Sequence, residues 1–500
     1  MNIKAFFKNI SLAAILMVSA SSCAEWLKVD MEDGIMEDAL YSDDEGFMTV
    51  LNGIYTNLNG TYGQFWSMGA IDVMAQYYNV PATGDHPYKL YATYSYSDSN
   101  FDTASGSLWT NLYNLIANIN VLIDHCDKEG SAISERYYPI IKGEALALRA
   151  MLHFDMLRFY GPIYSAETET QPAIPYLDIP NNKEMVAISS AKEVAGKVLR
   201  DLNEAAKLLE NDPIRTDGVQ SSEPETPNET NDFRYRQYRL NYYAVQGLLA
   251  RLYLWTGDKT NAYNCAHTLL TEINEKNTFP WVSKASATDI SNPDRVFSTE
   301  VMFGLYNTSR ENLYNSLFAQ SLEGNALTFV GGLSGETSKV ATFYGENSSS
   351  DYRKKMWEEV AVSSSEEDAN MTSSSYFLKY QGLTTDSHYR YMIPLMRISE
   401  MYLILAECTT DLTEAISCIN TIRWNRNLTE EVEFTEEERS TYIMNEFARE
   451  VIGEGQLFYY YKRNAMEKIP SGTSANATYN MVVPDNYVVP LPTTETNNRQ

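Results

Sequence analysis

Helical periodicity over long stretches is the feature that most constrains how this chain can fold. Apolar residues recur every three or four positions in "GSLWTNLYNLIANINVLIDHCDK", residues 106–128, and Ser105 or Ser107 is the expected N-cap. The same spacing appears in residues 136–161 and 190–210. A helix with such a stripe buries it against another element. The sequence therefore predicts a mostly α fold.

The most specific local pattern is "QGLLARLYLWTGDKTNAYNCAHTLL", residues 246–270. Its small or aromatic positions are Ala250, Tyr253, Ala262 and Ala266. Gly257 marks a turn between two helices. The pattern resembles a tetratricopeptide repeat, in which small residues let paired helices approach closely. A weaker copy occupies residues 401–423. Two such hairpins are too few for a solenoid, so we expect them to form one packed wall.

Elsewhere the periodicity is poor. Residues 276–392 are rich in Ser, Gly, Asn and Thr, and so long a stretch inside a compact domain is usually functional or mobile. A shorter acidic insertion, residues 215–233, is expected to be a solvated loop. The predicted organisation is one domain, residues 23–500, with a helical scaffold at about 104–275 and 394–465 and irregular excursions at about 60–102 and 276–392.

The first residues have the pattern of an export signal. Lys4 and Lys8 precede an apolar run at residues 10–18, and small residues then lead to Cys23. The run is shorter than the ~20 residues that span a bilayer. We expect residues 1–22 to be removed and Cys23 to be the lipid anchor, as in bacterial lipoproteins. The alternative is a secreted protein in which Cys23 has no special role.

The charge balance restricts the partners. The formal net charge is −27, whereas nucleic-acid binding depends on Lys and Arg side chains that neutralise phosphates. We therefore expect no nucleic-acid partner, and contact with a membrane only through the lipid anchor.

Catalytic and metal-binding motifs are missing from the sequence. It contains no HExxH, no GxSxG elbow and no GxxxxGK[ST] loop. The 66 acidic residues do not single out a glycosidase pair. His153, within a helical pattern, is interpreted as a helix residue with a local partner. We expect a protein that is not an enzyme and that holds neither a cofactor nor a metal ion.

The cysteines after Cys23 are far apart and form no CxxC pair. They are Cys126, Cys265, Cys408 and Cys418. Each lies in a helical apolar pattern, so buried thiols are expected, since a zinc site needs closer spacing. The sequence leaves a disulfide open.

Four segments, in this order, resemble the SusD/RagB family of Bacteroidetes outer-membrane lipoproteins. They are "LRAMLHFDMLRFYGPI" continuing to "AIPY", "LMRISEMYLILAECTTDLTEAISCINTIRWNRN", "EERSTYIMNEFAREVIGEGQLFYYYKRN" and "YVVPLPTTETNNR". Gln456 and Tyr460 depart from the family's usual Arg and Asp, which indicates a divergent subgroup.

The resemblance implies a SusD-like helical fold, with tetratricopeptide-like helix pairs and long ligand-facing loops. It also implies a non-enzymatic cell-surface protein that binds a glycan or oligosaccharide and delivers it to a SusC-like TonB-dependent outer-membrane transporter. Capture of peptides or another nutrient, and a helical-repeat scaffold for protein partners, are the alternatives.

Aromatic residues are concentrated in one loop-like segment. From Tyr62 to Phe101, ten of forty residues are aromatic, which is 25% against 12% for the whole chain. An aromatic ring can stack on the apolar face of a sugar while interleaved amides and carboxylates bond its hydroxyls. The alternative is that the rings pack against the helical wall, as about half are expected to do. The predicted ligand-binding residues are Trp66, Asp72, Tyr77, Tyr78, Tyr94, Tyr96, Asn100 and, from the second excursion, Trp281.

Overall fold

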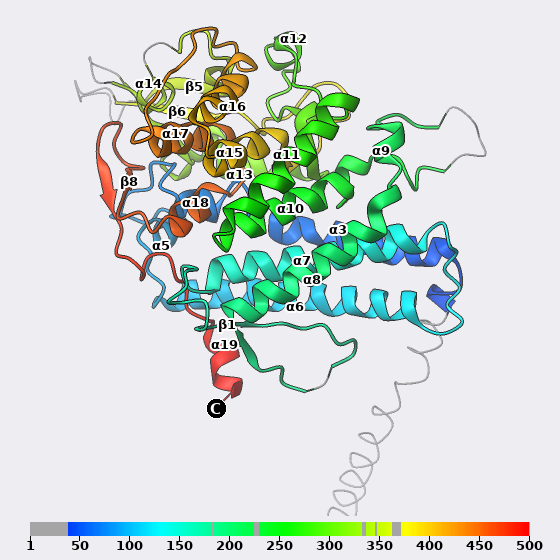
Figure 1. Cartoon of the computed structure of the whole chain (residues 1–500). Coiled ribbons are helices and arrows are strands. Elements are labelled where there is room, and N and C mark those ends of the chain that lie inside the picture. The colour runs from blue at the N-terminus through cyan, green and yellow to red at the C-terminus, as the bar shows by residue number, and fades with distance from the viewer. Residues whose placement is uncertain are drawn as a thin grey trace, which may run out of the picture.

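The structure is a computed structural model that describes residues 39–182, 184–224, 230–332, 337–345, 348–362 and 372–499. The described chain is mostly helical, with short strands between the helices (Figure 1). Cys23 and the predicted export signal lie outside the described residues. Among the described helices, none combines the length and the apolar character needed to cross a bilayer.

Helices of different lengths pack side by side as a wall. They are α3 (Asp44–Tyr62), α6 (Ser99–Asp127), α7 (Tyr138–Tyr160), α8 (Ala191–Leu208), α10 (Tyr242–Trp255), α11 (Lys259–Lys276), α15 (Ile398–Cys408), α16 (Leu412–Trp424), α17 (Arg439–Val451) and α18 (Leu457–Arg463). Helices α6, α7 and α8 lie next to one another, and α10 and α11 cross above them (Figure 1). The predicted mostly α fold is confirmed.

Both predicted helical hairpins are present. Helix α10 pairs with α11, α15 pairs with α16, and α11 packs against α15, so the two hairpins lie together in the wall. Gly257, in the first turn, has φ +82°, a conformation that glycine adopts without steric cost. Ala250, Ala262, Ala266, Ala406 and Ala415 are completely buried. Their small side chains therefore lie where the helices approach one another.

Helix α7 is the central helix. Every residue from Ile140 to Tyr160 is buried, which is why its pattern is only weakly amphipathic. Its charged residues have charged partners: the Arg149 guanidinium lies 2.6 Å from Asp201, Glu144 pairs with Arg236, and Arg158 pairs with Asp155. Such pairing is needed because an unpaired charge in the interior is costly.

The scaffold begins earlier than the sequence analysis predicts. Helix α3 lies about 60 residues before the expected start at 104, and α6 begins at Ser99. The side chain of Asp98 caps α6 by accepting a 2.8 Å bond from the Asn100 amide. Ser105 and Ser107 are therefore inside the helix, and the predicted caps at these serines are wrong.

The strands form small antiparallel sheets. The pairs are β1 (Pro172–Pro175) with β2 (Ile188–Ser190), β3 (Val301–Tyr306) with β7 (Met392–Arg397), and β8 (Lys468–Pro470) with β9 (Thr478–Asn480), and a three-stranded sheet has the order β4 (Thr328–Val330), β6 (Thr372–Phe377), β5 (Trp357–Val362). The stretch 276–392, expected to be irregular, thus contains regular strands. Their β-branched and aromatic positions were obscured by the surrounding polar residues.

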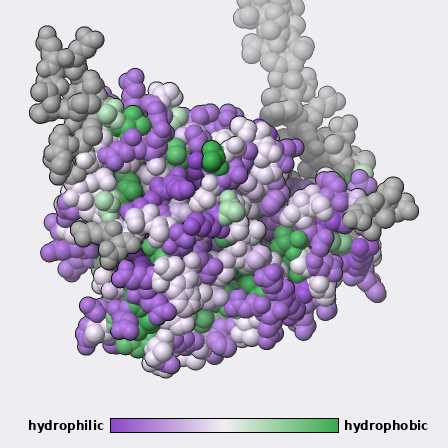
Figure 2. Space-filling view, turned by 90° about the horizontal axis from the view of Figure 1, so that it is seen from above, coloured by the Kyte–Doolittle hydropathy of each residue, from purple (hydrophilic) through white to green (hydrophobic). Residues whose placement is uncertain are grey.

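Short helices connect these elements. The α-helices are α4 (Ala70–Met74), α5 (Lys89–Ala92), α9 (Ile214–Asp217), α12 (Lys284–Ala287), α13 (Arg310–Leu317), α14 (Lys339–Tyr344) and α19 (Thr493–Thr496). The 3₁₀ turns are η1 (Leu209–Asn211), η2 (Arg236–Tyr238), η3 (Ser298–Glu300), η4 (Gln320–Asn325), η6 (Tyr352–Met356) and η7 (Asn497–Arg499). The surface seen from above is mainly polar, with small separate apolar patches (Figure 2).

A buried ionic cluster fastens the second excursion to the wall. Its arginines are Arg353, Arg397 and Arg426, and its carboxylates are Glu300, Asp351, Glu446, Glu450 and Glu454. Arg426 lies 2.7 Å from Glu300 and 2.8 Å from Glu450. Burial acts to raise the pKa of Glu450, but Arg426 and Arg397 outweigh it and hold that pKa well below its ordinary value. The cluster is therefore charged and paired.

Candidate binding site

The structure buries most of the rings predicted to form a ligand platform. Trp66, Tyr77, Tyr78 and Tyr94 belong to the core. The Trp66 ring centroid lies 5.1 Å from that of Phe159. A ring packed in this way has no face left for a ligand, so the predicted exposed platform is wrong for these four residues. The alternative interpretation, in which the rings pack against the helical wall, describes them.

Three tyrosine hydroxyls of this segment bond to the chain itself. Tyr94 donates to the Met74 carbonyl at 2.6 Å, and Tyr77 donates to the Ala448 carbonyl at 2.6 Å. The half-buried Tyr96 donates to the Asn486 carbonyl at 2.6 Å. Burial raises the pKa of all three tyrosines well above the ordinary value. These three hydroxyl groups therefore link separate segments of the chain and are not free to bind a ligand.

Asp72 is also an internal residue. Its carboxylate is buried and accepts hydrogen bonds from the Gly453 amide at 2.6 Å and from the Gly455 amide at 3.1 Å. Burial raises its pKa well above the ordinary value. Both glycines have positive φ, +79° and +67°, so Asp72 fixes the turn between α17 and α18.

The last two predicted residues lie in different places. Asn100 is exposed in the first turn of α6. Trp281 is half-buried, with its ring centroid 5.4 Å from that of Tyr402 and the Arg426 guanidinium 5.1 Å above it. The structure therefore does not bring the eight predicted residues together at one surface.

A different group of tyrosines borders a large open pocket, which we call the tyrosine pocket. Its volume is about 670 Å³, within the range of small-molecule sites. It is lined by Met48, Asn52, Tyr55, Thr56, Asn59, Ser221, Glu223, Asn231, Asp232, Arg234, Tyr235, Tyr238, Arg239, Leu305, Tyr306, Asp386, Ser387, His388 and Tyr391. Helix α3, strand β3 and two loops thus supply its walls.

Tyr306 is the most exposed ring of the pocket, with 51% of its surface accessible. It is the last residue of β3, in which the five preceding residues are buried. Its ring meets those of Tyr238 and Tyr391 edge to face, with both centroid separations 5.4 Å. Asn59 of α3 donates to the Tyr306 carbonyl at 3.1 Å. Neighbouring side chains therefore fix an exposed aromatic ring in place.

The tyrosine pocket is held together by its own polar contacts. The Tyr238 hydroxyl donates to the His388 carbonyl at 2.6 Å and so joins η2 to the loop before β7. The Arg239 guanidinium lies 4.6 Å from the Tyr55 ring centroid and donates to the Asn52 side chain. Contacts of this kind keep a site formed before a ligand arrives.

Residues 220–224 and 230–235 contribute one wall. Tyr235 has a left-handed backbone (φ 52°), and its amide donates to the Gln220 carbonyl at 2.8 Å. Glu223 accepts from Asn231 at 2.6 Å and from the Tyr235 hydroxyl at 3.3 Å. A non-glycine residue in this conformation costs energy and is concentrated at functional sites. The insertion at residues 215–233 was expected to be only a solvated loop. Its described residues Ser221, Glu223, Asn231 and Asp232 instead line the pocket.

The pocket combines rings with amide and carboxylate groups. The polar groups include Asn231, Asp232 and Asp386. Rings offer apolar faces, and amides and carboxylates accept or donate hydrogen bonds. The pocket can therefore hold a ligand that is apolar on one face and rich in hydroxyls at its edge. The signal in the sequence was the run "FRYRQYR", residues 233–239, which the sequence analysis did not single out.

The structure also shows the surroundings of His153 and of the four cysteines after Cys23. His153 stacks on Tyr176 and accepts the Leu177 amide at 3.0 Å, and its second ring nitrogen contacts the Arg149 carbonyl at 2.9 Å. Cys126, Cys265, Cys408 and Cys418 are free thiols; Cys126 and Cys418 are buried, and the other two are partly buried. In the described part of the chain, no three His, Cys, Asp or Glu side chains are grouped so as to hold a metal ion.

Comparisons with known proteins cover nearly the whole described chain. Residues 48–254 match a family model described as starch-binding and associating with the outer membrane, and residues 215–499 match the model of the SusD family. SusD-like protein P25 of Formosa agariphila is 26% identical over 172 residues, 32% of this chain and 31% of that protein. The aligned regions thus span between 31% and 38% of the curated relatives' own length.

Solved structures share the fold. A SusD superfamily protein from Bacteroides thetaiotaomicron has a TM-score of 0.63 at 21% identity, over 91% of this chain and 98% of that chain. A structure from Bacteroides vulgatus, titled as a SusD-like carbohydrate binding protein, has a TM-score of 0.62 at 19% identity, over 86% and 85% of the two chains. At these identities the similarity establishes the fold.

Proposed function

Because the chain belongs to the SusD family, we propose that it is a non-enzymatic protein of the cell surface that binds an oligosaccharide in the tyrosine pocket. The family model over residues 48–254 is described as starch-binding, and one structural neighbour is titled a surface glycan-binding protein. Both support a carbohydrate as the ligand class.

The exposed ring of Tyr306 is the observation that carries this proposal. It borders a cavity of about 670 Å³ and is held by Tyr238 and Tyr391. Large exposed aromatic rings in a concave site are suited to stack on an apolar ligand face. A sugar ring has such a face, and its hydroxyls can bond to Asn231, Asp232 and Asp386 around the pocket.

Delivery to a membrane transporter is the second part of the proposal. A SusC-like TonB-dependent transporter is the proposed partner, and lipid at Cys23 would keep the protein beside it. Cys23→Ala is expected to release the protein from outer membranes. Persistent membrane association of this variant in cells lacking the transporter would contradict the anchor. Co-purification of the two proteins tests the partnership.

Calorimetry with the purified protein and its Tyr306→Ala variant tests the ligand site. With a panel of oligosaccharides, we expect weak binding by the wild-type protein and at least a ~tenfold loss in the variant, equivalent to ~1.4 kcal/mol. Trp424→Ala is the matched control, since Trp424 is an aromatic residue of α16 with 49% of its surface exposed, outside the tyrosine pocket.

The outcomes separate the alternatives. Binding that survives Tyr306→Ala would contradict the assignment of the pocket. Binding of peptides but of no oligosaccharide would support the alternative nutrient. A sugar converted to products during long incubation would contradict the non-enzymatic role.

A further inference from the structure

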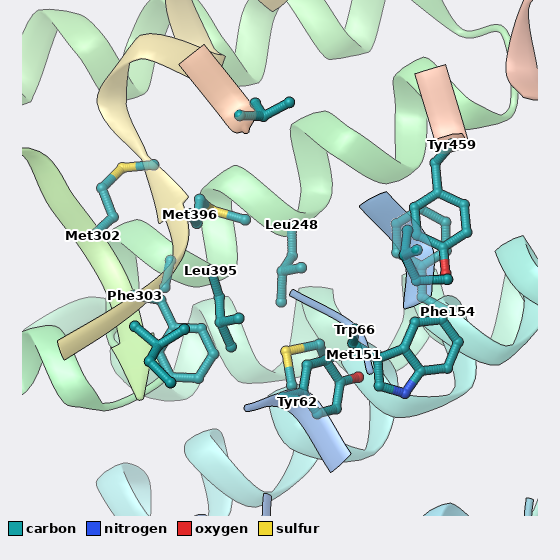
Figure 3. Packing of buried hydrophobic residues seen from close by; sticks show 14 of the residues in the cluster. Tyr62, Trp66, Met151, Phe154, Leu248, Met302, Phe303, Leu395, Met396 and Tyr459 are labelled. Atoms are coloured by element: carbon teal, nitrogen blue, oxygen red, sulfur yellow. The ribbon is translucent and has the colours of Figure 1, made fainter. Parts of the chain in front are cut away.

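The centre of the wall is closely packed. Trp66, Leu248 and Tyr459 converge there (Figure 3), and the cavity that they help to line has a volume of only about 10 Å³. Such a space is too small for any ligand larger than water. A second ligand therefore needs a pocket that opens at the surface.

One such pocket, which we call the lysine pocket, has a volume of about 270 Å³. It lies between α14, α17, α18 and the β8–β9 hairpin, on one side of the molecule (Figure 1). Phe343, Met444, Ala448 and Leu457 give it an apolar wall. The volume is just below the usual range for drug-sized ligands, so the pocket suits a smaller molecule. It shares no lining residue with the tyrosine pocket.

Lys339 of α14 lies at the wall of this pocket. Only 4% of its surface is exposed. Its ammonium group donates hydrogen bonds to the carbonyls of Gln76 at 3.0 Å, Tyr77 at 2.7 Å and Ser471 at 2.7 Å. These three residues also line the pocket, which places the ammonium group at its wall.

The charge of Lys339 lacks a counter-ion. Among the described residues, no carboxylate lies within ion-pair distance of its ammonium group, so burial acts alone and lowers its pKa to about 7. Lys379, another buried lysine, has Glu454 at 2.6 Å. Lys462 is held by two carbonyls but does not line the pocket. Lys339 therefore combines an unbalanced charge with an adjacent cavity.

The remaining lining also favours an anion. No Asp or Glu of the described chain lines the lysine pocket, and Arg449, which shares the carboxylate of Glu446 with Arg353, is its second cation. The tyrosine pocket, by contrast, is lined by Asp232 and Asp386 among others. In a chain with a net charge of −27, a pocket with two cations and no carboxylate selects a negatively charged ligand.

Two uncharged groups can bond the hydroxyls of a ligand. Only 1% of Tyr461 is exposed, and its hydroxyl has no hydrogen-bond partner among the described residues, yet it is not sealed from solvent. Because Tyr461 lines the lysine pocket, the pocket is the opening that reaches this hydroxyl. Gln76 donates through Nε2 to the Ala92 carbonyl at 2.8 Å, which leaves its Oε1 as an acceptor. Its left-handed backbone, φ 57°, is costly for a residue other than glycine and is concentrated at functional sites.

We propose that the lysine pocket is a second ligand site, which binds a small hydroxy acid of the sugar-acid class. The carboxylate of the ligand balances the charge of Lys339, its hydroxyls bond to Tyr461 and Gln76, and its carbon skeleton packs on the apolar wall. This site does not depend on the proposed function of the tyrosine pocket, because the two pockets have no lining residue in common.

Crystals soaked in D-glucuronate or in D-glucose test the site. The two sugars have the same ring and differ only in that a carboxylate replaces the terminal CH₂OH group. We expect density for glucuronate in the lysine pocket and none for glucose at the same concentration. Equal occupancy by glucose would overturn the selection of an anion, and an empty pocket in both crystals would overturn the site.

Calorimetry on the Tyr306→Ala protein measures binding in solution while the tyrosine pocket is impaired. We expect this protein to bind glucuronate. Adding Lys339→Gln keeps an N–H donor for the carbonyls but removes the charge, and should weaken glucuronate binding at least ~tenfold. Lys207→Gln, at an exposed position of α8, is the matched control and should leave it unchanged. If only the protein with Tyr306 intact binds glucuronate, the ligand belongs to the tyrosine pocket and the second site is overturned.

A second variant keeps the test decisive if Lys339→Gln fails to fold, which circular dichroism would reveal. Tyr461→Phe retains the ring and should weaken glucuronate binding roughly threefold or more, because one hydrogen bond is lost. Tyr442→Phe, at a half-exposed position of α17 outside the lysine pocket, is its control. Unchanged glucuronate affinity in folded Tyr461→Phe and Lys339→Gln proteins would overturn the proposal.

Discussion

The Tyr96 hydroxyl donates a 2.6 Å hydrogen bond to the carbonyl of Asn486, 390 positions further along the chain. This contact joins the first aromatic excursion to the C-terminal strip. Tyr96, which the sequence predicts to be a ligand contact, therefore links two segments near opposite ends of the described chain.

Removing this group of rings is expected to destabilise the protein and to leave ligand binding in place. Tyr94→Ala should lower the free energy of unfolding by about 3 kcal/mol, because a buried ring is lost. Tyr96→Phe should cost about 0.5–1.5 kcal/mol for its one hydrogen bond. Urea unfolding measures both changes, and calorimetry on the folded variants measures binding. Unchanged stability with lost binding would restore the platform that the sequence predicts.

Overpacking the first hairpin is expected to be costly. Ala250 is completely buried on α10, so Ala250→Leu should lower the free energy of unfolding by about 1–3 kcal/mol. Glu275→Leu, at an exposed position of α11, adds apolar volume without a steric clash and is the control. Equal melting temperatures for Ala250→Leu and the wild-type protein would contradict the close helix contact.

Breaking the buried ionic cluster is expected to lower the free energy of unfolding more than overpacking the first hairpin does. Arg426→Met leaves Glu300 and Glu450 buried with less positive charge and should cost about 3–5 kcal/mol. Lys192→Met removes one partner of the exposed pair with Glu169 and should cost at most about 1 kcal/mol. Chemical unfolding of the two variants compares them directly, and similar losses would argue against the cluster as the fastening of the excursion.

The buried imidazole of His153 predicts a pH dependence of stability. Burial lowers its pKa to about 3, whereas an unfolded histidine has a pKa of about 6.5. Between these values the unfolded chain binds a proton that the folded chain does not. The free energy of unfolding should therefore fall, by up to ~1.4 kcal/mol per pH unit from this group, as the pH is lowered from about 6.5 to about 3.

Variants separate this contribution from that of the carboxylates. His153→Gln is expected to lose stability at neutral pH and to show a shallower decline on acidification. His267→Gln, at an exposed position of α11, should follow the wild-type curve. Parallel curves for His153→Gln and the wild-type protein would show that the imidazole does not titrate as its burial requires.

The helical wall could be predicted from sequence because its signals are local. The spacing of Ala250, Gly257 and Ala262 predicts paired helices, and the structure contains them. Helix α3 was not predicted because Gly53, Gly60 and several asparagines lower the helix propensity of its sequence. The start of α6 was placed late because Asp98 lies among turn-forming residues.

The candidate site could not be predicted because it depends on contacts that are distant in sequence. Tyr306 reaches its place through the pairing of β3 with β7, and Tyr391 immediately precedes β7. Ring density in the sequence does not reveal which rings are buried, since tyrosine satisfies both a core and a surface. Trp66 and Tyr94 therefore looked like ligand contacts, whereas Tyr306 had no distinguishing signal.

The sheet formed by β3 and β7 has a consequence for how such a protein can change over evolutionary time. Tyr306 pairs with Met392, and Val301 pairs with Arg397, so the long segment between the two strands leaves the wall and returns to it at one place. Arg397 and Glu300 then lock that place into the ionic cluster. Lengthening or exchanging a loop whose ends are already joined costs little stability. The segment also supplies Asp351 and Arg353 to that cluster. A lineage can therefore change the residues just before β7 that line the pocket, such as Asp386 and Ser387, while inheriting the wall and the buried parts of the segment.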